Sequence, residues 1–441
     1  MTHRLTVLGT GYLGATHAAC MASLGYDVLG MDVDAEKIAR LSAGELPFYE
    51  PGLEPILRKA IGDGRLTFTT SYEEAAAFGD VHFICVGTPQ QAASNAADMR
   101  YVDSVVDGIS PHLTRPAIVV GKSTVPVGTA ERIAKRIADL APAPDDVELC
   151  WNPEFLREGF AVDDTLRPDR LVFGVVPGGR AEQVLREVFA PVVAQADCPV
   201  VVMDLASAQL VKTAANAFLA TKISFINAMA EVCEATGADV KKLSEALGHD
   251  ARIGGRFLHA GLGFGGGCLP KDIRAFMARA EELGVEQALS FLSEVDAINL
   301  RRRARMVDIS REQVGGSFSG KRVAVLGAAF KPNSDDTRDS PALDVAAAIQ
   351  GEGADVTVYD PAAVDNARRL HPELAYAASA VEAAQDADVV LHLTEWSEFK
   401  DMDPSVLDGV VHEKHIVDGR NALDPARWRA AGWTYRALGR P

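Results

Sequence analysis

The sequence predicts an α/β protein in which two Rossmann-like, doubly wound domains are bridged by a long central helix and a helical segment. Three observations predict this fold. Short apolar runs alternate with helical stretches in the first third of the chain and again in the last third, and residues 205–236 form a helical run without glycine or proline. We expect domains over residues 1–204, 205–314 and 315–441.

Seven short apolar runs supply the strands of the first domain. They cover residues 4–9, 27–33, 81–87, 117–124, 147–153, 170–176 and 199–204. Buried runs that alternate with helices are typical of a parallel sheet covered by helices on both faces. We therefore expect one parallel, doubly wound sheet.

The helical run 205–236 stops at Gly237. Its length, roughly 45 Å, exceeds the width of one small domain. Helices of this length join domains or form the core of a dimer, so we expect a homo-oligomer, at least a dimer. After the break "GGSFSGK" the alternation restarts with "RVAVLGAAF", "DVTVYDP", "DVVLHLT" and "HIVDGRN", which predict the second α/β domain.

Charge and cysteine content disfavour several classes of function. The formal net charge of -17 argues against nucleic acid and anionic membranes as partners. Six scattered cysteines, without a CxxC pair or a Cys/His cluster, indicate thiols in a reducing compartment and no metal site. No apolar run approaches a membrane span, and a first strand at residue 4 leaves no room for a signal peptide. We expect a cytoplasmic protein.

The segment "LGTGYLG" sets Gly9, Gly11 and Gly14 in a GxGxxG pattern. The bare pattern is weak evidence, but here it follows a strand and opens a helix, and Asp32 ends the next strand. Such glycines let a pyrophosphate approach the helix N-terminus, and the acid suits a ribose diol and would repel a 2′-phosphate. We expect NAD rather than NADP; the alternative is a Rossmann domain that has lost its cofactor.

The second domain has "VLGAAFKP" at the equivalent place. Only Gly327 matches the glycine pattern, and Lys331 follows it. Two alternatives stay open at this point: the domain binds another phosphate-bearing ligand, or it is purely structural.

The segment "GFGGGCLPKD" sets Cys268 between a glycine run and a predicted helix, whose first turn suits Pro270. The helix dipole and Lys271 favour the thiolate, and we expect the glycines to be flexible and to let a substrate approach the sulfur. A nucleophile is therefore favoured over a packing role. The other five cysteines lie in apolar strands or helices, or beside a turn, and are expected to pack as small hydrophobes.

A dinucleotide site together with a nucleophilic cysteine indicates oxidation past the aldehyde. A hydride leaves an alcohol, and the thiolate captures the aldehyde as a thiohemiacetal. A second hydride transfer gives a thioester, which water hydrolyses to the acid.

Ten motifs follow one another along the chain: "GTGYLG", "VGTP", "KSTVPVGT", "NPEFLREG", "RPDRLVFG", "KTAANAFLATKISFIN", "RIGGRFL", "GFGGGCLPKD", "FKPNSDDTRDSP" and "DGRN". In this order they resemble the UDP-glucose/GDP-mannose dehydrogenase family over essentially the full length. "NAFLATKISFIN" and "RPDRLVFG" resemble its UDP-glucose branch more than its GDP-mannose or UDP-N-acetylmannosamine branches. The resemblance implies NAD-dependent, four-electron oxidation of UDP-glucose to UDP-glucuronate.

The resemblance also implies roles for single residues. The implied catalytic residues are Cys268 as nucleophile, Lys212 and Asn216 for the oxyanion, Asp272 and Thr124 for a water, and Glu154 as base. The implied cofactor contacts are Gly9, Gly11, Tyr12, Leu13, Gly14, Asp32, Lys37, Thr88, Thr124, Glu158, Lys271 and Arg338.

The implied substrate contacts come from several motifs. They are Glu154, Phe155, Leu156, Arg157, Lys212, Asn216, Arg252, Phe257, Leu258, Gly265, Cys268, Phe330, Lys331 and Arg420. Among them, Lys331 and Arg420 are the sugar-nucleotide contacts of the second domain, and Arg252 reaches across a dimer interface.

Several of these residues also have plainer explanations. Without the motifs, Asp272 is an ordinary first-turn acid, Glu154 a cap of the turn after Pro153, and Arg338 a partner of Asp335, Asp336 or Asp339. Lys212 and Asn216 would be solvated helix positions, although the residues around them are mostly apolar.

Two positions depart from the family pattern: Gly267, where serine is common, and Leu269, where phenylalanine is common. Both flank the nucleophile, so we expect thioester geometry or cofactor exchange to differ. Two alternatives to the function stay open. One is a different UDP-hexose or a GDP-sugar as substrate, and the other is a nucleotide-sugar sensor in which Cys268 is a redox switch.

Overall fold

The computed structural model of the protein describes residues 3–441. The chain forms two compact units, Met1–Ala215 with Arg274–Leu283 and Asn216–Ile273 with Gly284–Pro441. Two of the three boundaries between them fall inside helices, α9 (Leu205–Thr236) and α11 (Leu269–Glu282), and the third follows the end of α11. The domain limits expected at residues 204 and 314 stay predictions.

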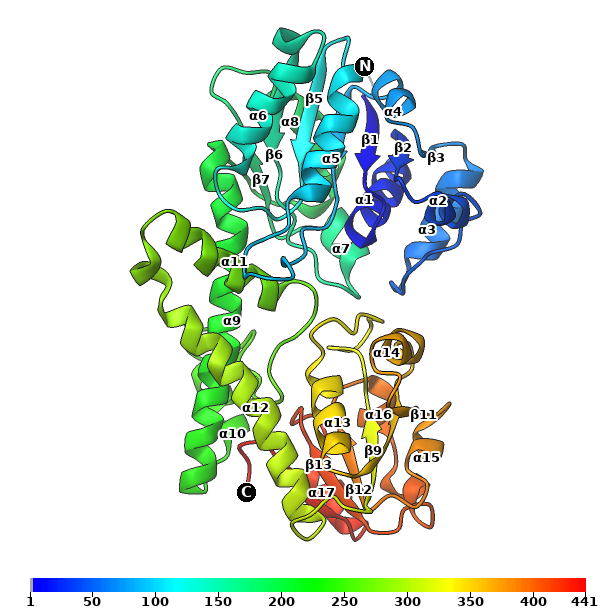
Figure 1. The fold of residues 1–441 in the computed structure, drawn as a ribbon, viewed down its shortest axis with the longest axis vertical. Helices are drawn as coiled ribbons and strands as arrows, with labels where there is room; N and C mark the ends of the chain where they lie inside the picture. The colour runs from blue at the N-terminus through cyan, green and yellow to red at the C-terminus, as the bar shows by residue number, and fades with distance from the viewer. Residues whose placement is uncertain (1–2) are drawn as a thin grey trace. The chain divides into compact units, whose positions relative to one another are not determined.

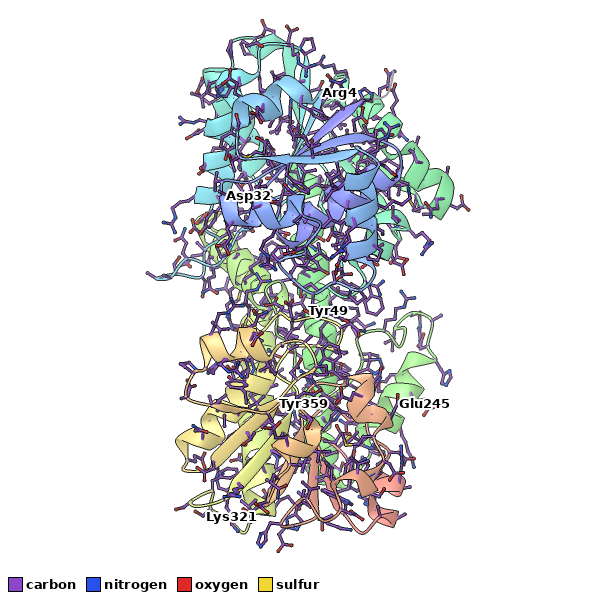
Figure 2. All side chains as sticks on the ribbon, turned by 90° about the vertical axis from the view of Figure 1, so that its right-hand side faces the viewer. Arg4, Asp32, Tyr49, Glu245, Lys321 and Tyr359 are labelled. Atoms are coloured by element: carbon purple, nitrogen blue, oxygen red, sulfur yellow. The ribbon has the colours of Figure 1, made fainter. Side chains whose placement is uncertain are left out.

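An eight-stranded sheet, in the order β3-β2-β1-β4-β5-β6-β7-β8, forms the centre of the first unit. The strands are β1 (Arg4–Leu8), β2 (Asp27–Met31), β3 (Leu66–Thr69), β4 (Val81–Ile84), β5 (Ala117–Gly121), β6 (Val147–Trp151), β7 (Leu171–Gly174) and β8 (Val200–Met203). The order of the first six strands is that of a dinucleotide-binding fold. Figure 2 labels Arg4, at the amino end of β1, and Asp32, directly after the carboxyl end of β2, at opposite edges of this sheet.

Helices pack around the sheet (Figure 1). They are α1 (Tyr12–Ser23), α2 (Ala35–Ser42), α3 (Leu53–Gly62), α4 (Tyr72–Phe78), α5 (Arg100–Ile109), α6 (Thr129–Leu140), α7 (Ala161–Leu166) and α8 (Ala181–Ala196). Leu5 and Val7 of β1 belong to one buried cluster and Leu8 to another. Because successive side chains of a strand point to opposite faces, both faces of the sheet are covered, as the apolar runs predict.

The sheet differs from the expected parallel sheet at β7. This strand pairs with β6 in the antiparallel sense, through Trp151 and Gly174, and β8 runs parallel to β7. A parallel neighbour needs a crossover to the opposite edge of the sheet. Here the connection 152–170 contains only the short helix α7, and β7 starts from the edge at which β6 ends. The segment "NPEFLREG" follows β6 at this carboxyl edge.

The central helices are α9, α10 (Val240–Gly248), α11 and α12 (Phe291–Gln313). The long green helix in Figure 1 is α9, and its bounds are those expected from the sequence. None of the helices in residues 3–441 is long and apolar enough to cross a membrane.

The second unit contains a six-stranded parallel sheet in the order β11-β10-β9-β12-β13-β14. Its strands are β9 (Arg322–Leu326), β10 (Asp355–Tyr359), β11 (Ala375–Tyr376), β12 (Val389–His392), β13 (His415–Asp418) and β14 (Thr434–Ala437). Its helices are α13 (Pro341–Gly351), α14 (Val364–Leu370), α15 (Ala380–Ala383), α16 (Ser397–Asp401) and α17 (Pro425–Ala430). Figure 2 labels Lys321, before the amino end of β9, and Tyr359, at the carboxyl end of β10. The strand order repeats the pattern of the first unit, so the second domain is Rossmann-like, as expected.

Candidate active site

The turn between β1 and α1 has the geometry of a pyrophosphate cradle. Gly9 has a φ of 90°, and a Cβ on Gly14 would lie 1.8 Å from the carbonyl oxygen of Gly9. These two glycines therefore permit the tight turn and the close packing of α1 on β1. A Cβ on Gly11 would meet no atom within 4 Å, so the space above the helix N-terminus is open. This open, helix-capping position fits a dinucleotide phosphate.

Asp32 lies beside this turn. Its Oδ2 accepts hydrogen bonds from the backbone amide of Thr10 at 2.8 Å and from Nζ of Lys37 at 3.0 Å. Burial acts to raise the pKa of Asp32, but the hydrogen bonds and the Lys37 ammonium outweigh it and lower that pKa. The carboxylate therefore stays ionised at neutral pH, as an acceptor for a ribose diol requires.

Glu50, a buried residue that the sequence analysis did not single out, fixes the loop after β6 next to the glycine turn. Glu50 accepts a hydrogen bond from the Tyr12 hydroxyl, and it also accepts the backbone amides of Gly159 at 2.7 Å and Ala161 at 2.8 Å. Burial and this carboxylate raise the pKa of Tyr12 well above its usual range. Glu50 thus fixes the end of the "NPEFLREG" segment, which includes Glu158, against the start of α1. It lies in a loop without periodicity, so no local pattern marks it.

Two expected site residues meet after β4 and β5. The hydroxyl of Thr88 donates to the backbone carbonyl of Thr124 at 2.7 Å. Both residues follow the carboxyl ends of adjacent parallel strands, which explains their proximity. Leu13, in the first turn of α1, is partly buried and packs against the core of this unit.

Lys212 and Glu154 form a nearly buried ion pair. The Lys212 Nζ lies 3.1 Å from Oε1 of Glu154, and the two side chains are only 6% and 13% exposed. Glu154 also accepts the backbone amide of Leu156, so it caps the turn as well. The ring of Phe155 lies beside Lys212, with its centroid 5.6 Å from Nζ. Arg157, in contrast, is exposed and pairs with Asp164.

Asn216 lies one turn after Lys212 in α9, and it is buried, as is Asp272. The Asn216 Nδ2 donates to Oδ2 of Asp272 at 2.6 Å, and Lys271 Nζ lies 2.5 Å from the other carboxylate oxygen. Asp272 is therefore more than a first-turn acid, because it orients the Asn216 amide. Thr124 belongs to the first unit and Asp272 to the second, so their shared water stays a prediction.

Cys268 precedes α11 directly, and its carbonyl accepts the backbone amide of Asp272 at 3.0 Å. It is the exposed one of the six cysteines, all of which are thiols. The other five are buried, and burial raises the pKa of Cys20 and Cys85 to about 12. The contrast agrees with one reactive thiol and five packing residues.

The glycines before Cys268 are closely packed by other segments, and their flexibility stays a prediction. A Cβ on Gly263 would lie 2.2 Å from the amide oxygen of Asn299, and one on Gly265 would lie 2.2 Å from the carbonyl oxygen of Asp339. A Cβ on Gly266 would lie 2.8 Å from the Phe330 ring. Glycine is needed here because other segments approach the backbone closely.

Arg338 lies directly against Gly267, one of the two positions that depart from the family pattern. A Cβ at this position would lie 2.2 Å from Cζ of Arg338, so the guanidinium fills the space of the missing side chain. Asp336 holds that guanidinium through Nε and Nη2 and also accepts the Gly267 amide at 3.3 Å. Asp336, one of the three acids near Arg338, therefore pairs with it.

In the second domain, three of the expected substrate contacts lie just after the carboxyl ends of strands. Phe330 and Lys331 follow β9, and Arg420 follows β13. Such edges are where open α/β sheets bind ligands. The Asp32 equivalent is Asp360, whose Oδ2 accepts the backbone amides of Ala328 and Ala329 and the Trp396 indole. This carboxylate is fully occupied by the protein, which argues against a second dinucleotide site.

The "RIGGRFL" segment provides three further expected contacts. Arg252 is exposed and pairs with Asp250. Phe257 has a φ of 63°, in the left-handed region that non-glycine residues rarely adopt. Leu258 is buried in a small cluster with Ile226, so its side chain contributes to packing. In the described part of the chain, no group of three or more histidine, cysteine or acidic residues could hold a metal ion.

Three sequence models of the UDP-glucose/GDP-mannose dehydrogenase family match the chain. The NAD binding domain matches residues 3–193, the central domain 206–301 and the UDP binding domain 324–425. The open glycine turn and Asp32 lie within the first of these matches, and NAD is accordingly the cofactor.

Several curated and solved relatives resemble the chain over nearly its full length. A UDP-glucose 6-dehydrogenase of Rhizobium meliloti is 41% identical, with 99% of this chain and 100% of the relative covered. One of Pseudomonas aeruginosa is also 41% identical, with 99% and 98% covered. The structure of a UDP-glucose dehydrogenase from Pyrobaculum islandicum has a TM-score of 0.91 at 39% identity, with 100% and 98% covered. A UDP-D-ManNAc dehydrogenase from Pyrococcus horikoshii has a TM-score of 0.86 at 27% identity, with 99% of each chain covered.

Proposed function

This chain belongs to the UDP-glucose/GDP-mannose dehydrogenase family, and from that premise we propose that it oxidises UDP-glucose to UDP-glucuronate through thiohemiacetal and thioester intermediates on Cys268. It is an NAD-dependent dehydrogenase, and we propose that it uses two NAD and one water per sugar. The observation that carries the thiol chemistry is the exposed Cys268 at the N-terminus of α11. The identity of 39–41% to UDP-glucose dehydrogenases, against 27% to a UDP-D-ManNAc dehydrogenase, favours glucose as the sugar.

NAD, when bound, accepts a hydride. Gly9, Gly11 and Gly14 would hold its pyrophosphate, and Asp32 its ribose diol. The further proposed contacts are Tyr12, Leu13, Lys37, Thr88, Thr124, Glu158, Lys271 and Arg338. The acid at position 32 would repel a 2′-phosphate, so we expect NADP to bind poorly.

The proposed reaction proceeds in two oxidations and one hydrolysis. In the first oxidation, the C6 carbon of the sugar loses a hydride and its hydroxyl loses a proton, which gives an aldehyde. The sulfur of Cys268 bonds to the aldehyde carbon, and the resulting thiohemiacetal loses a second hydride and a proton to become a thioester. Water then adds to the acyl carbon and the C–S bond breaks, which releases the carboxylate and restores the thiol.

The buried polar groups would stabilise the charges that develop on the reacting oxygen. Lys212 and Asn216 are one turn apart in α9, and we propose that both donate to the oxyanion. Glu154, paired with Lys212, is the proposed base for the water, which Thr124 and Asp272 would position. The proposed sugar and linker contacts also include Phe155, Leu156, Arg157 and Gly265.

The nucleotide half of the substrate would bind the second domain. Lys331 and Arg420 lie within the UDP binding domain of the family, residues 324–425, at the carboxyl edge of the second sheet. Phe257 and Phe330 would lie near the base, with Leu258 as a further contact. The cationic and aromatic groups suit a uridine diphosphate, and the crowded Asp360 turn does not suit a second dinucleotide.

Counting NADH per sugar tests the reaction. Purified enzyme with limiting UDP-glucose and excess NAD should form two NADH per UDP-glucose consumed. One NADH per sugar would mean that the reaction stops at the aldehyde, and binding of both ligands without NADH would identify the sensor instead.

In the same assay kcat/KM with NADP should be at least about tenfold lower than with NAD, which is about 1.4 kcal/mol. Equal use of the two cofactors would contradict the role of Asp32.

We also propose that the protein is at least a dimer, with a second copy packed along α9. Phe218, Phe225 and Val232 recur every seventh residue on this helix and are 65%, 48% and 53% exposed. Such a stripe of large apolar side chains is typical of a helix seam. Arg252, exposed on the same unit, is the proposed contact to the partner's substrate. The Phe218→Glu/Phe225→Glu variant should sediment as a monomer while the wild type sediments as a dimer or larger; a wild-type monomer would contradict the proposal.

A further inference from the structure

Arg420 is almost buried, with a side chain only 11% exposed, and its guanidinium contacts three separate segments. Its Nε donates to the carbonyl of Leu393 at 2.7 Å, Nη1 to the carbonyl of Gly263 at 2.9 Å, and Nη2 to the carbonyl of Phe330 at 3.1 Å. Three of its five N–H groups are therefore used by the protein itself. Only the planar fork of an arginine can donate in these directions at once.

The backbone of Arg420 is itself held firmly. Its amide donates to Oδ1 of Asp418 at 3.0 Å, and the fully buried Asp418 also accepts from His392 and from the hydroxyl of Tyr435. The next residue, Asn421, donates to the carbonyl of Ala260 at 3.1 Å. Two side chains of the turn after β13, Arg420 and Asn421, therefore donate hydrogen bonds to the backbone of residues 260–263.

We propose that Arg420 is a positioning residue that fixes the glycine loop of Cys268 against the sugar-nucleotide loop at Phe330. The Gly263 carbonyl starts the loop that ends at Cys268, and the Phe330 carbonyl directly precedes Lys331. One guanidinium therefore sets the place of the nucleophile relative to the nucleotide-binding loop. The inference rests on the proposed function only in taking Cys268 as the reactive thiol, and it revises the view of Arg420 as simply a substrate contact.

Alkylation of Cys268 in ligand-free enzyme separates the two roles. Iodoacetamide should modify this exposed cysteine, while the other five cysteines are buried. In Arg420→Gln we expect the alkylation rate at pH 7 to fall about fivefold, because a loosened loop holds the thiol less often at the N-terminus of α11. Arg420→Lys, which keeps the charge but reaches fewer carbonyls, should fall in between. A substrate contact alone cannot change a rate that is measured without substrate.

Two matched variants complete the experiment. Arg302→Gln removes another buried arginine of the same unit, paired with Glu234, and should lower the Tm without changing the alkylation rate. Lys331→Ala should weaken UDP binding, leave NAD binding almost unchanged and leave alkylation unchanged. If Arg420→Gln does not fold, Arg420→Lys decides the question.

A rate in Arg420→Gln that stays within about twofold of wild type, or that rises, overturns the proposal, whatever happens to UDP affinity. If only Arg420→Lys folds, a rate equal to or above that of wild type overturns it. A wild-type enzyme that makes no UDP-glucuronate would contradict the proposed function instead, and the alkylation comparison would still be valid.

Discussion

Replacement of Cys268 by alanine should abolish UDP-glucuronate formation while NAD and UDP-glucose still bind. Without the sulfur, the aldehyde has no group on the protein to which it can bond, so the second oxidation has no thiohemiacetal to act on. We expect acid formation to fall to less than about one thousandth of the wild-type rate, as for other covalent nucleophiles. Calorimetric titration of both ligands and mass spectrometry of the product would check this. Supplied with the aldehyde and NADH, the variant should still reduce it, because that step needs no thiol.

The serine variant provides the trapped intermediate. An alkoxide forms less readily than a thiolate, and an ester hydrolyses more slowly than a thioester. Cys268→Ser should therefore stall after the first or the second hydride transfer, and quenched enzyme should carry a sugar-nucleotide adduct at position 268. Cys198→Ala, which removes a buried thiol, is the matched control and should keep its activity. If Cys268→Ala still forms two NADH per sugar at a near-normal rate, the cysteine is structural.

Replacement of Lys212 by methionine should lower kcat by about a hundred- to a thousandfold, the loss typical of removing one oxyanion donor. Methionine keeps most of the side-chain volume, so the change removes mainly the charge. It also removes the ammonium that lies 3.1 Å from the Glu154 carboxylate, so this nearly buried carboxylate loses the lysine that pairs with it. Breaking a buried pair in this way costs about 3–5 kcal/mol of unfolding free energy.

A double variant separates catalysis from stability. In Lys212→Met/Glu154→Gln the unpaired carboxylate is gone, so the unfolding free energy should recover most of the loss while kcat stays low. Lys242→Ala, an exposed lysine of α10, should change neither quantity. Urea unfolding and steady-state kinetics measure the two effects. A Lys212→Met enzyme that keeps kcat within about threefold would show that the ion pair serves stability alone.

Much of the architecture is encoded in local patterns. The helix α9 has the bounds that its glycine- and proline-free run predicts. Each apolar run that was expected to form a strand does contain one in the structure. The strands without a prediction are β3, β11 and β14, and each lies at an edge of its sheet. Their sequences, LTFT, AY and TYRA, are short and most contain polar residues, so they lack the continuous apolar run of a buried strand, which the edge strand β8 does have. The sense of β7 also escaped prediction, because strand direction depends on where a connection returns and not on the strand's own residues.

The features of the candidate site also fall into two groups, those that the sequence predicts and those that only the structure reveals. By itself the sequence determined the glycine turn with Asp32, the cysteine at a helix start, and the pair on α9, because each depends on spacing within one segment. Only the tertiary structure decided that Glu50 holds the loop after β6, that the glycines before Cys268 make room for other segments, and that Arg420 donates to three carbonyls. Each of these depends on segments that are far apart in the sequence and come into contact in the fold. The order and spacing of residues along the chain indicate helices, strands and turns. They do not indicate which distant segment of the backbone will pack beside a given residue.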